Sequence, residues 1–107
     1  MGEKIQNLLL CLGINSTYLG YNYLTYALYL CTQNEDYLTS VYKALYVEVA
    51  SYFHTTRYNV EHCLRTVVKR CWYQGNQELL KEIAKYPLTD KPTNSEFIDI
   101  LYHHLMQ

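Results

Sequence analysis

The sequence predicts an all-α fold: one domain over residues 1–107, with five or six helices and a helix-turn-helix at about residues 46–73. Apolar residues recur three and four positions apart along most of the chain, as on helices with one buried side, and no segment alternates like a strand. Half of the residues are hydrophobic, which suffices for one core and argues against disorder. The clearest apolar stripe comprises Val60, Cys63, Leu64, Val67, Val68, Cys71 and Trp72.

The first half of the chain predicts two helices and a shorter one. A helix over residues 3–12 should end at Gly13, and residues 15–17 should cap a tyrosine-rich helix over residues 17–32. The chain has 13 tyrosines, most of which we expect to pack into the domain with their hydroxyl groups at the surface. A polar turn leads to a short helix over residues 37–45, with Leu38, Val41 and Leu45 inward, which is free to continue into residues 46–53.

The second half predicts three helices with recognisable caps. Thr55 or Thr56 can cap a helix over residues 57–73, and Gly75 is a candidate left-handed residue after it. Asn76 should cap a helix over residues 77–86, stopped by Pro87. The last helix follows the capping box Thr93-Asn94-Ser95-Glu96, with Pro92 and Phe97 at the hydrophobic-staple positions, and it buries Phe97, Ile98, Leu101 and Leu105.

The helix-turn-helix prediction depends on three positions. Two helices that cross closely need a small residue, a tolerant turn residue and a hydrophobic residue facing back from the second helix. Ala50, His54 and Val60 stand at the required offsets of four and six residues. Histidine is one of the non-glycine residues enriched at positive φ, so His54 is acceptable in the turn.

Charge is concentrated in the same region. The chain has a net charge of −1, but residues 54–75 hold Arg57, Arg65, Lys69 and Arg70 against Glu61, for +3. The segments before and after are acidic, at −2 each. The only basic segment is therefore the candidate recognition helix, and a distribution of this kind is more informative than the net charge.

Other classes of protein find little support. There are no paired catalytic carboxylates, no phosphate-binding glycine loop and no nucleophile motif, so we expect no enzyme, no cofactor and no small-molecule substrate. The four cysteines lack zinc-ligand spacing, and we expect Cys63 and Cys71 to be small core residues. No apolar stretch is long enough to span a membrane and no signal peptide is evident, so we expect a cytoplasmic protein.

Several motifs resemble one known family. The segments YVEVASYFHTTRYNVEHCLRTVVKRCWYQGN and KPTNSEFI are similar to the C-terminal effector domain of the stage-zero sporulation protein A family, transcription regulators of endospore-forming bacteria. The likeness lies in the Ala-xxx-Phe-x-Thr-Thr turn, in Val60-Glu61 with Leu64-Arg65, and in Trp72 with Gly75-Asn76. Residues 91–97 add an intact seven-residue match, and weaker similarity extends back to residues 12–14.

The resemblance implies a sequence-specific DNA-binding transcription regulator of sporulation, with helix 57–73 in the major groove of double-stranded DNA. Base contacts are expected from its N-terminal half, where Arg65 could bind guanine and Glu61 could accept from cytosine. Arg57, Lys69 and Arg70 would contact phosphates. The full set of base-contact candidates is Tyr58, Asn59, Glu61, His62, Arg65 and Thr66.

Departures from the family pattern keep an alternative open. Family arginines appear here as Asn59 and His62, and a family histidine as Thr66, which predicts weaker binding or another target sequence. The alternative is a protein-interaction module with this fold that modulates a family member. The resemblance also implies tandem protomers, or a homodimer, that meet through the last helix. No receiver domain, which in the family precedes the effector domain, is expected in residues 1–107.

Overall fold

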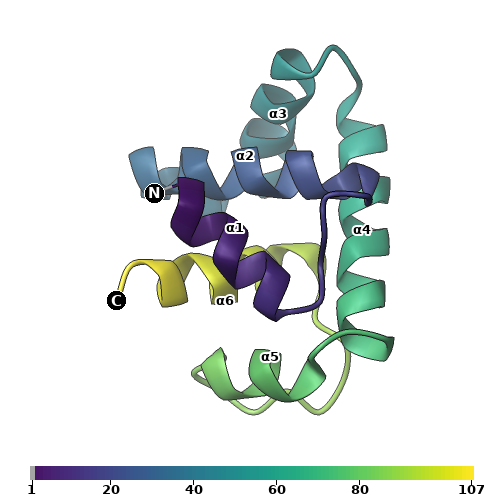
Figure 1. Ribbon diagram of the computed structural model, residues 1–107. Coiled ribbons are helices and arrows are strands. Elements are labelled where there is room, and N and C mark those ends of the chain that lie inside the picture. Colours follow the sequence, from purple (N-terminus) through teal and green to yellow (C-terminus); the bar gives the residue numbers. More distant parts are fainter. Residues whose placement is uncertain (1) are drawn as a thin grey trace.

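The computed structural model describes residues 2–107, and within them it is all-α, which confirms the predicted fold class (Figure 1). The α-helices are α1 (Gly2–Cys11), α2 (Leu19–Gln33), α3 (Tyr46–Tyr52), α4 (Arg57–Tyr73), α5 (Gln77–Ile83) and α6 (Asn94–Leu105). A 3₁₀-helix, η1 (Glu35–Thr39), and a turn of π-helix, η2 (Val41–Leu45), connect α2 to α3. No helix among these residues is long and apolar enough to cross a membrane.

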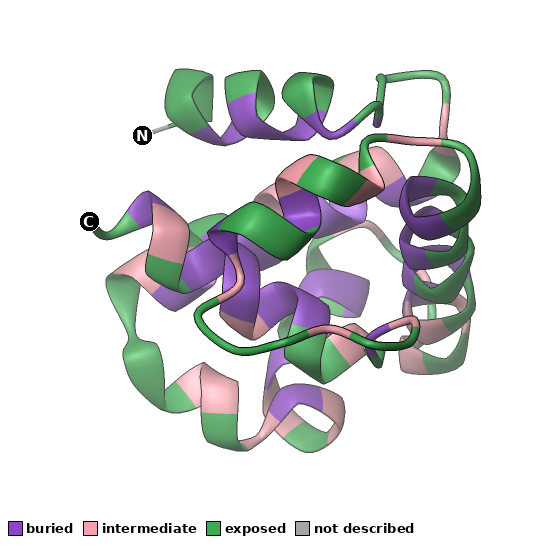
Figure 2. Cartoon of the chain, turned by 90° about the horizontal axis from the view of Figure 1, so that it is seen from below, coloured by how far each residue is buried: buried purple, intermediate pink, exposed green. Residues whose placement is uncertain are grey.

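One hydrophobic core joins the helices, and α2 runs through its centre. It contacts α1, α3, α4 and α6, while α5 closes the lower end of α4 (Figure 1). All seven residues of the predicted α4 stripe are buried, and Figure 2 shows that side of α4 turned inward and its other side exposed. The periodicity of the sequence therefore places the right face of α4 against the core.

Two glycines bring distant backbones together at the end of α4. Gly13 has φ of +84°, as expected for the residue that ends the first helix. Gly75 is not left-handed, contrary to the prediction. It is required instead by a close approach, since a Cβ atom there would lie 2.5 Å from the carbonyl oxygen of Leu12. The backbone N–H of Asn76 donates to that same oxygen at 3.1 Å, which ties the α1 turn to the α4 end.

The entry to α2 also differs from the prediction. The helix begins after Tyr18, and no side chain caps it. Asn15 instead closes a local turn, in which its Oδ1 accepts from the backbone N–H of Thr17 at 2.9 Å. Asparagine commonly forms such turns with the backbone two residues later, and here this competes successfully with helix capping.

The predicted short helix over residues 37–45 is two elements. The 3₁₀-helix η1 is capped by Asn34 and ends at Thr39; Ser40 separates it from η2, which runs directly into α3. The continuation that the sequence allowed is therefore observed, but the break at Ser40 was not predicted. Val41 and Leu45 are buried as expected, and Leu38 is only half-buried.

The last two helices begin as predicted, but α5 ends early. Its chain is already extended at Ala84, three residues before Pro87, so proline does not stop it. Lys85 and Tyr86 are exposed and Ala84 is only half-buried, so little apolar contact is available to hold another helical turn. The α6 capping box is confirmed: Thr93 Oγ1 accepts from the Glu96 N–H at 3.2 Å, and Glu96 Oε1 accepts from the Thr93 N–H at 2.8 Å.

Trp72 is 8% exposed, which places it in the core as predicted, and truncating it should destabilise the domain. We expect Trp72→Ala to lower the free energy of unfolding by about 3–5 kcal/mol, the usual cost of a large core truncation. Urea denaturation followed by circular dichroism measures it. The neighbouring Tyr73, 65% exposed, supplies the control, because Tyr73→Ala should change stability by less than about 0.5 kcal/mol. Equal losses in the two variants would contradict the assignment.

Gly20 lies where α2 crosses α4, and a side chain there has no room. A Cβ atom would lie 2.6 Å from both the Cys63 carbonyl oxygen and Val67 Cγ2. Gly20→Ala should therefore destabilise the domain by about 1–3 kcal/mol, although alanine favours helices. Gly2→Ala is the matched control, since nothing lies within 4 Å of its Cβ position. A thermal melt in which Gly20→Ala is as stable as the wild type would show that the two helices are not in close contact.

Candidate nucleic-acid interface

The helix-turn-helix is formed by α3, the turn at residues 53–56 and α4. His54 has φ of +56°, the left-handed conformation that the offset rule assigned to it. Thr56 caps α4, because its Oγ1 accepts from the Asn59 N–H at 3.1 Å. Ala50 and Val60 are buried on the facing sides of the two helices. The predicted motif is therefore present, and α4 has the predicted bounds.

The predicted site residues occupy the outer side of α4 (Figure 2). Three lie half-buried at its edges, namely Arg57, Asn59 and Glu61. The exposed ones are Tyr58, His62, Arg65, Thr66, Lys69 and Arg70. The structure thus brings all nine to one helix, with the exposed ones along the middle and the others toward the flanks.

Arg65 and Glu61 form an ion pair one helical turn apart. Arg65 Nη2 lies 3.3 Å from Glu61 Oε1, and 58% of the arginine side chain and 35% of the glutamate side chain are exposed. An exposed pair of this kind contributes little to stability. Its effect is to hold the guanidinium along the helix, where the remaining N–H donors are free to meet another acceptor.

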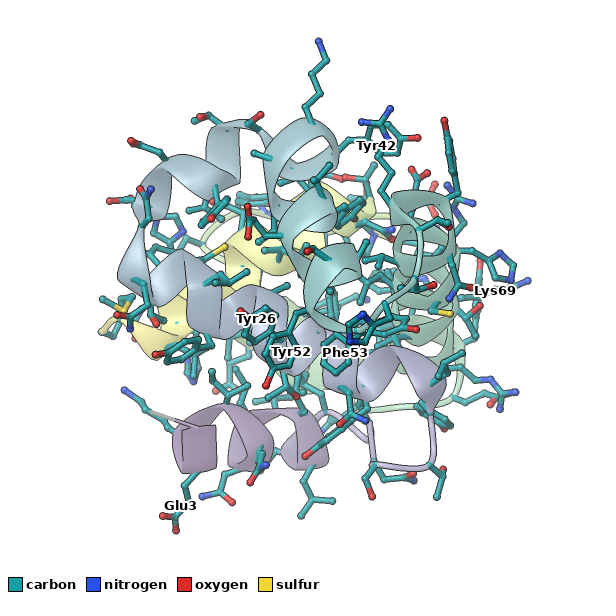
Figure 3. The ribbon with its side chains drawn as sticks, turned by 90° about the horizontal axis from the view of Figure 1, so that it is seen from above. Glu3, Tyr26, Tyr42, Tyr52, Phe53 and Lys69 are labelled. Atoms are coloured by element: carbon teal, nitrogen blue, oxygen red, sulfur yellow. The ribbon has the colours of Figure 1, made fainter. Side chains whose placement is uncertain are left out.

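Arg57 is held by two tyrosine rings at the start of α4. Its guanidinium carbon lies 4.7 Å from the ring centre of Tyr42 and 5.7 Å from that of Tyr58, and the two rings meet edge to face. Tyr42 comes from η2, outside the helix-turn-helix (Figure 3). Sequence reasoning missed it, because only the π-turn before α3 brings it to the recognition helix.

Asn59 is the predicted site residue most engaged within the protein. Its Nδ2 donates to Thr55 Oγ1 at 2.9 Å and lies 3.3 Å from the Tyr23 hydroxyl oxygen. Its Oδ1 accepts from Cys63 Sγ at 3.6 Å. Both ends of the amide thus have partners, so Asn59 could donate to a base from Nδ2 only if one of these bonds breaks.

The C-terminal half of α4 presents two cations in different ways. Arg70 donates to Gln74 Oε1 at 3.3 Å, and its guanidinium carbon lies 5.5 Å from the ring centre of Tyr18. Lys69 extends away from the domain (Figure 3). Between them, Thr66 Oγ1 donates to the backbone carbonyl of His62 at 3.2 Å. One cation thus lies against a tyrosine ring, whereas the other is exposed on the surface of α4.

Nothing in the described residues forms a metal-binding cluster, and residues 2–107 contain no group of three histidine, cysteine or acidic side chains that could hold an ion. Cys31, Cys63 and Cys71 are buried and Cys11 is exposed, all as free thiols. Burial raises the pKa of Cys31 to about 12 and that of Cys71 to about 11, so both thiols stay protonated at neutral pH. The predicted core role of Cys63 and Cys71 is confirmed.

Comparison with protein-family models matches residues 5–105 to the family described as "Sporulation initiation factor Spo0A C terminal". The match spans nearly the whole chain, including the helix-turn-helix, both flanks of α4 and the capping box of α6. The resemblance inferred from the motifs is thereby confirmed. The chain belongs to the family of C-terminal effector domains of the sporulation initiation factor Spo0A, which bind DNA and regulate transcription.

Proposed function

We propose that this domain is a sequence-specific transcription regulator whose helix α4 enters the major groove of double-stranded DNA. The observation that carries the proposal is the outer face of α4, where four cations stand on the second helix of a helix-turn-helix. An α-helix with its side chains is about as wide as the major groove, so this face would meet base edges. The acidic segments lie elsewhere in the chain and leave the basic face distinct.

Base reading falls mainly to Arg65 and Glu61. Guanine presents two acceptors in the major groove that suit a guanidinium, and cytosine presents an amino donor that suits a carboxylate. In the free domain Arg65 and Glu61 lie 3.3 Å apart. On binding they would give up this contact, so that Arg65 binds guanine and Glu61 binds cytosine. Tyr58, His62 and Thr66 are the other proposed base contacts. Asn59 can donate to a base only at the cost of one of its internal hydrogen bonds.

Phosphate contacts fall to Arg57, Lys69 and Arg70. Contacts of this kind fix the register of the protein on the duplex without reading sequence. Tyr42 and Tyr18 hold the two arginines at opposite ends of α4, which reduces the entropy lost when they bind. Tyr42 is therefore added to the proposed interface as a positioning residue.

Protomers are proposed to meet through α6, in tandem on DNA or as a homodimer. A hollow of 370 Å³ at the C-terminal half of α6 supports this, since apolar groups of Ile83, Tyr86 and Ile100 line it. Asp99 and His103, 3.2 Å apart, lie beside it and could pair across a contact.

A protein-interaction module with weak DNA binding is the second candidate. The engaged Asn59 amide favours it, because the family has an arginine at that position. A salt titration of binding to random duplex DNA separates the two. Several phosphate contacts give a steep loss of affinity with salt. A shallow slope together with weak binding would favour the interaction module.

Arg65 and Lys69 should respond differently to truncation. Arg65→Ala should weaken binding to a matched site by about 1–3 kcal/mol and relax its sequence preference, because a bidentate base contact is lost. Lys69→Ala should weaken matched and scrambled sites about equally and flatten the salt slope by about one unit. Fluorescence anisotropy with matched and scrambled duplexes measures both. Indistinguishable behaviour of the two variants would refute this division.

His62→Arg should strengthen DNA binding, because it adds a permanent cation at an exposed position on the outer face of α4. The salt slope should steepen by about one unit. Gln6→Arg is the matched control, since it adds the same charge at an exposed position on α1. If both variants gain affinity equally, net charge and not position 62 explains the effect.

A further inference from the structure

A polar hollow of 310 Å³ lies beside α4, on the flank that carries Glu61 and Arg65. It is enclosed by η2, α3, α4 and the N-terminus of α6. When a helix fills the major groove, the phosphates of the two strands run along its flanks. This hollow therefore opens where a DNA backbone would pass. Its lining residues are Val41, Tyr42, Tyr46, Glu61, Arg65, Lys91, Thr93, Asn94 and Ser95.

The start of α6 presents free backbone donors to this hollow. The capping box occupies the N–H groups of Thr93 and Glu96, and the Phe97 N–H donates to the Thr93 carbonyl. The N–H groups of Asn94 and Ser95 have no protein partner among residues 2–107. Unpaired amides at a helix N-terminus, together with the helix dipole, favour an anion.

Tyr46 supplies a second, independent sign of a missing partner. The residue is 2% exposed, and its hydroxyl has no hydrogen-bond partner within the described residues. Asn94 lies next to it and acts on the pKa of the hydroxyl as a hydrogen-bonding neighbour, although no bond between them has full hydrogen-bond geometry; Asn94 Nδ2 donates to the Glu61 carbonyl at 3.1 Å. Burial raises the pKa of Tyr46 to about 12, so the hydroxyl remains a donor at neutral pH. Buried polar groups without a partner are uncommon and point to an absent water or ligand.

The charges around the hollow also suit an anion. Of the charged lining residues Glu61, Arg65 and Lys91, the first two pair with each other, so Lys91 supplies the net positive charge. The carboxylate of Glu61 is paired with Arg65, and that of Glu96 is bound to the Thr93 N–H. The nearby Asp90 Oδ1 accepts from the Lys91 backbone N–H at 2.8 Å, and no ion pair joins Asp90 to the Lys91 ammonium group within the described residues.

We propose that this hollow binds a phosphodiester group of the DNA backbone, through Lys91, Ser95 and the first amides of α6. The inference rests on the proposed function and adds to it a contact outside the helix-turn-helix. A phosphate oxygen, directly or through one water molecule, also gives the Tyr46 hydroxyl its acceptor. The contact fixes the rotation of α4 in the groove, because it holds one flank against one strand.

Two variants test the site while preserving the fold. Lys91→Gln should lower affinity for matched and random duplexes roughly tenfold and flatten the salt slope by about one unit. Lys81→Gln is its control, since Lys81 is exposed on α5 and lines neither this hollow nor the one beside the C-terminal half of α6. Ser95→Glu places a carboxylate in the first turn of α6, where it suits the helix dipole. It should therefore keep the thermal midpoint yet lower DNA affinity, whereas Gln6→Glu should leave affinity nearly unchanged.

A titration with inorganic phosphate tests whether the hollow binds an anion when no DNA is present. When the titration is followed by two-dimensional NMR, the amide signals of Asn94 and Ser95 should shift and reach a plateau as phosphate is added. The shifts should be smaller in Lys91→Gln at the same phosphate concentration. If the wild type binds no duplex but these signals still saturate, the proposed function fails and the ligand is free phosphate, which overturns the DNA assignment. If Arg65→Ala weakens DNA binding while Lys91→Gln and Ser95→Glu bind like the wild type, the proposed function stands and the phosphate site is refuted.

Discussion

The contact between Gly20 and the backbone of α4 determines how the basic face is presented. A hypothetical Cβ atom at Gly20 would lie 2.6 Å from the Cys63 carbonyl oxygen, so α2 and α4 approach backbone to backbone. Tyr23, on the next turn of α2, lies within hydrogen-bonding distance of Asn59. Because α2 also packs against α1, α3 and α6, the whole core supports α4 from behind. The short turn at His54 therefore connects α3 to α4, whereas the packing of α2 determines how α4 is oriented on the domain.

A domain with a net charge of −1 can bind a polyanion only if its few cations are well placed. Arg57 and Arg70 stand at the two ends of α4, and each lies over a tyrosine ring from another element. Stacking suits a planar guanidinium and leaves its edges available for phosphate oxygens. The high tyrosine content therefore serves the surface as well as the core: Tyr23 and Tyr46 are buried, while Tyr58 and Tyr73 are each 65% exposed.

The sequence was most informative where local chemistry decides the structure. The bounds of α4 follow from an apolar stripe and the Thr56 cap, and the start of α6 follows from its capping box. The errors lie where distant segments decide. Gly75 is needed because Leu12 approaches it, and α5 stops where the chain becomes extended at Ala84, although Ala84 and Leu88 still pack at the edge of the core. The positions of Tyr42 and Lys91 beside α4 likewise depend on η2 and the loop before α6, which no periodicity reveals.

The two flanks of α4 differ in whether their hydrogen-bond donors already have partners within the described residues. On the flank of Asn59, the amide, Thr55 and the thiol of Cys63 already bond with one another. On the flank of Glu61, a buried hydroxyl and two helix amides have no partner among residues 2–107. A donor that already has a protein partner gains little from a phosphate, whereas an unpaired donor gains the net worth of a hydrogen bond, about 0.5–1.5 kcal/mol. A duplex should therefore lie closer to the start of α6 than to the start of α2, so that recognition depends on a helix outside the helix-turn-helix motif.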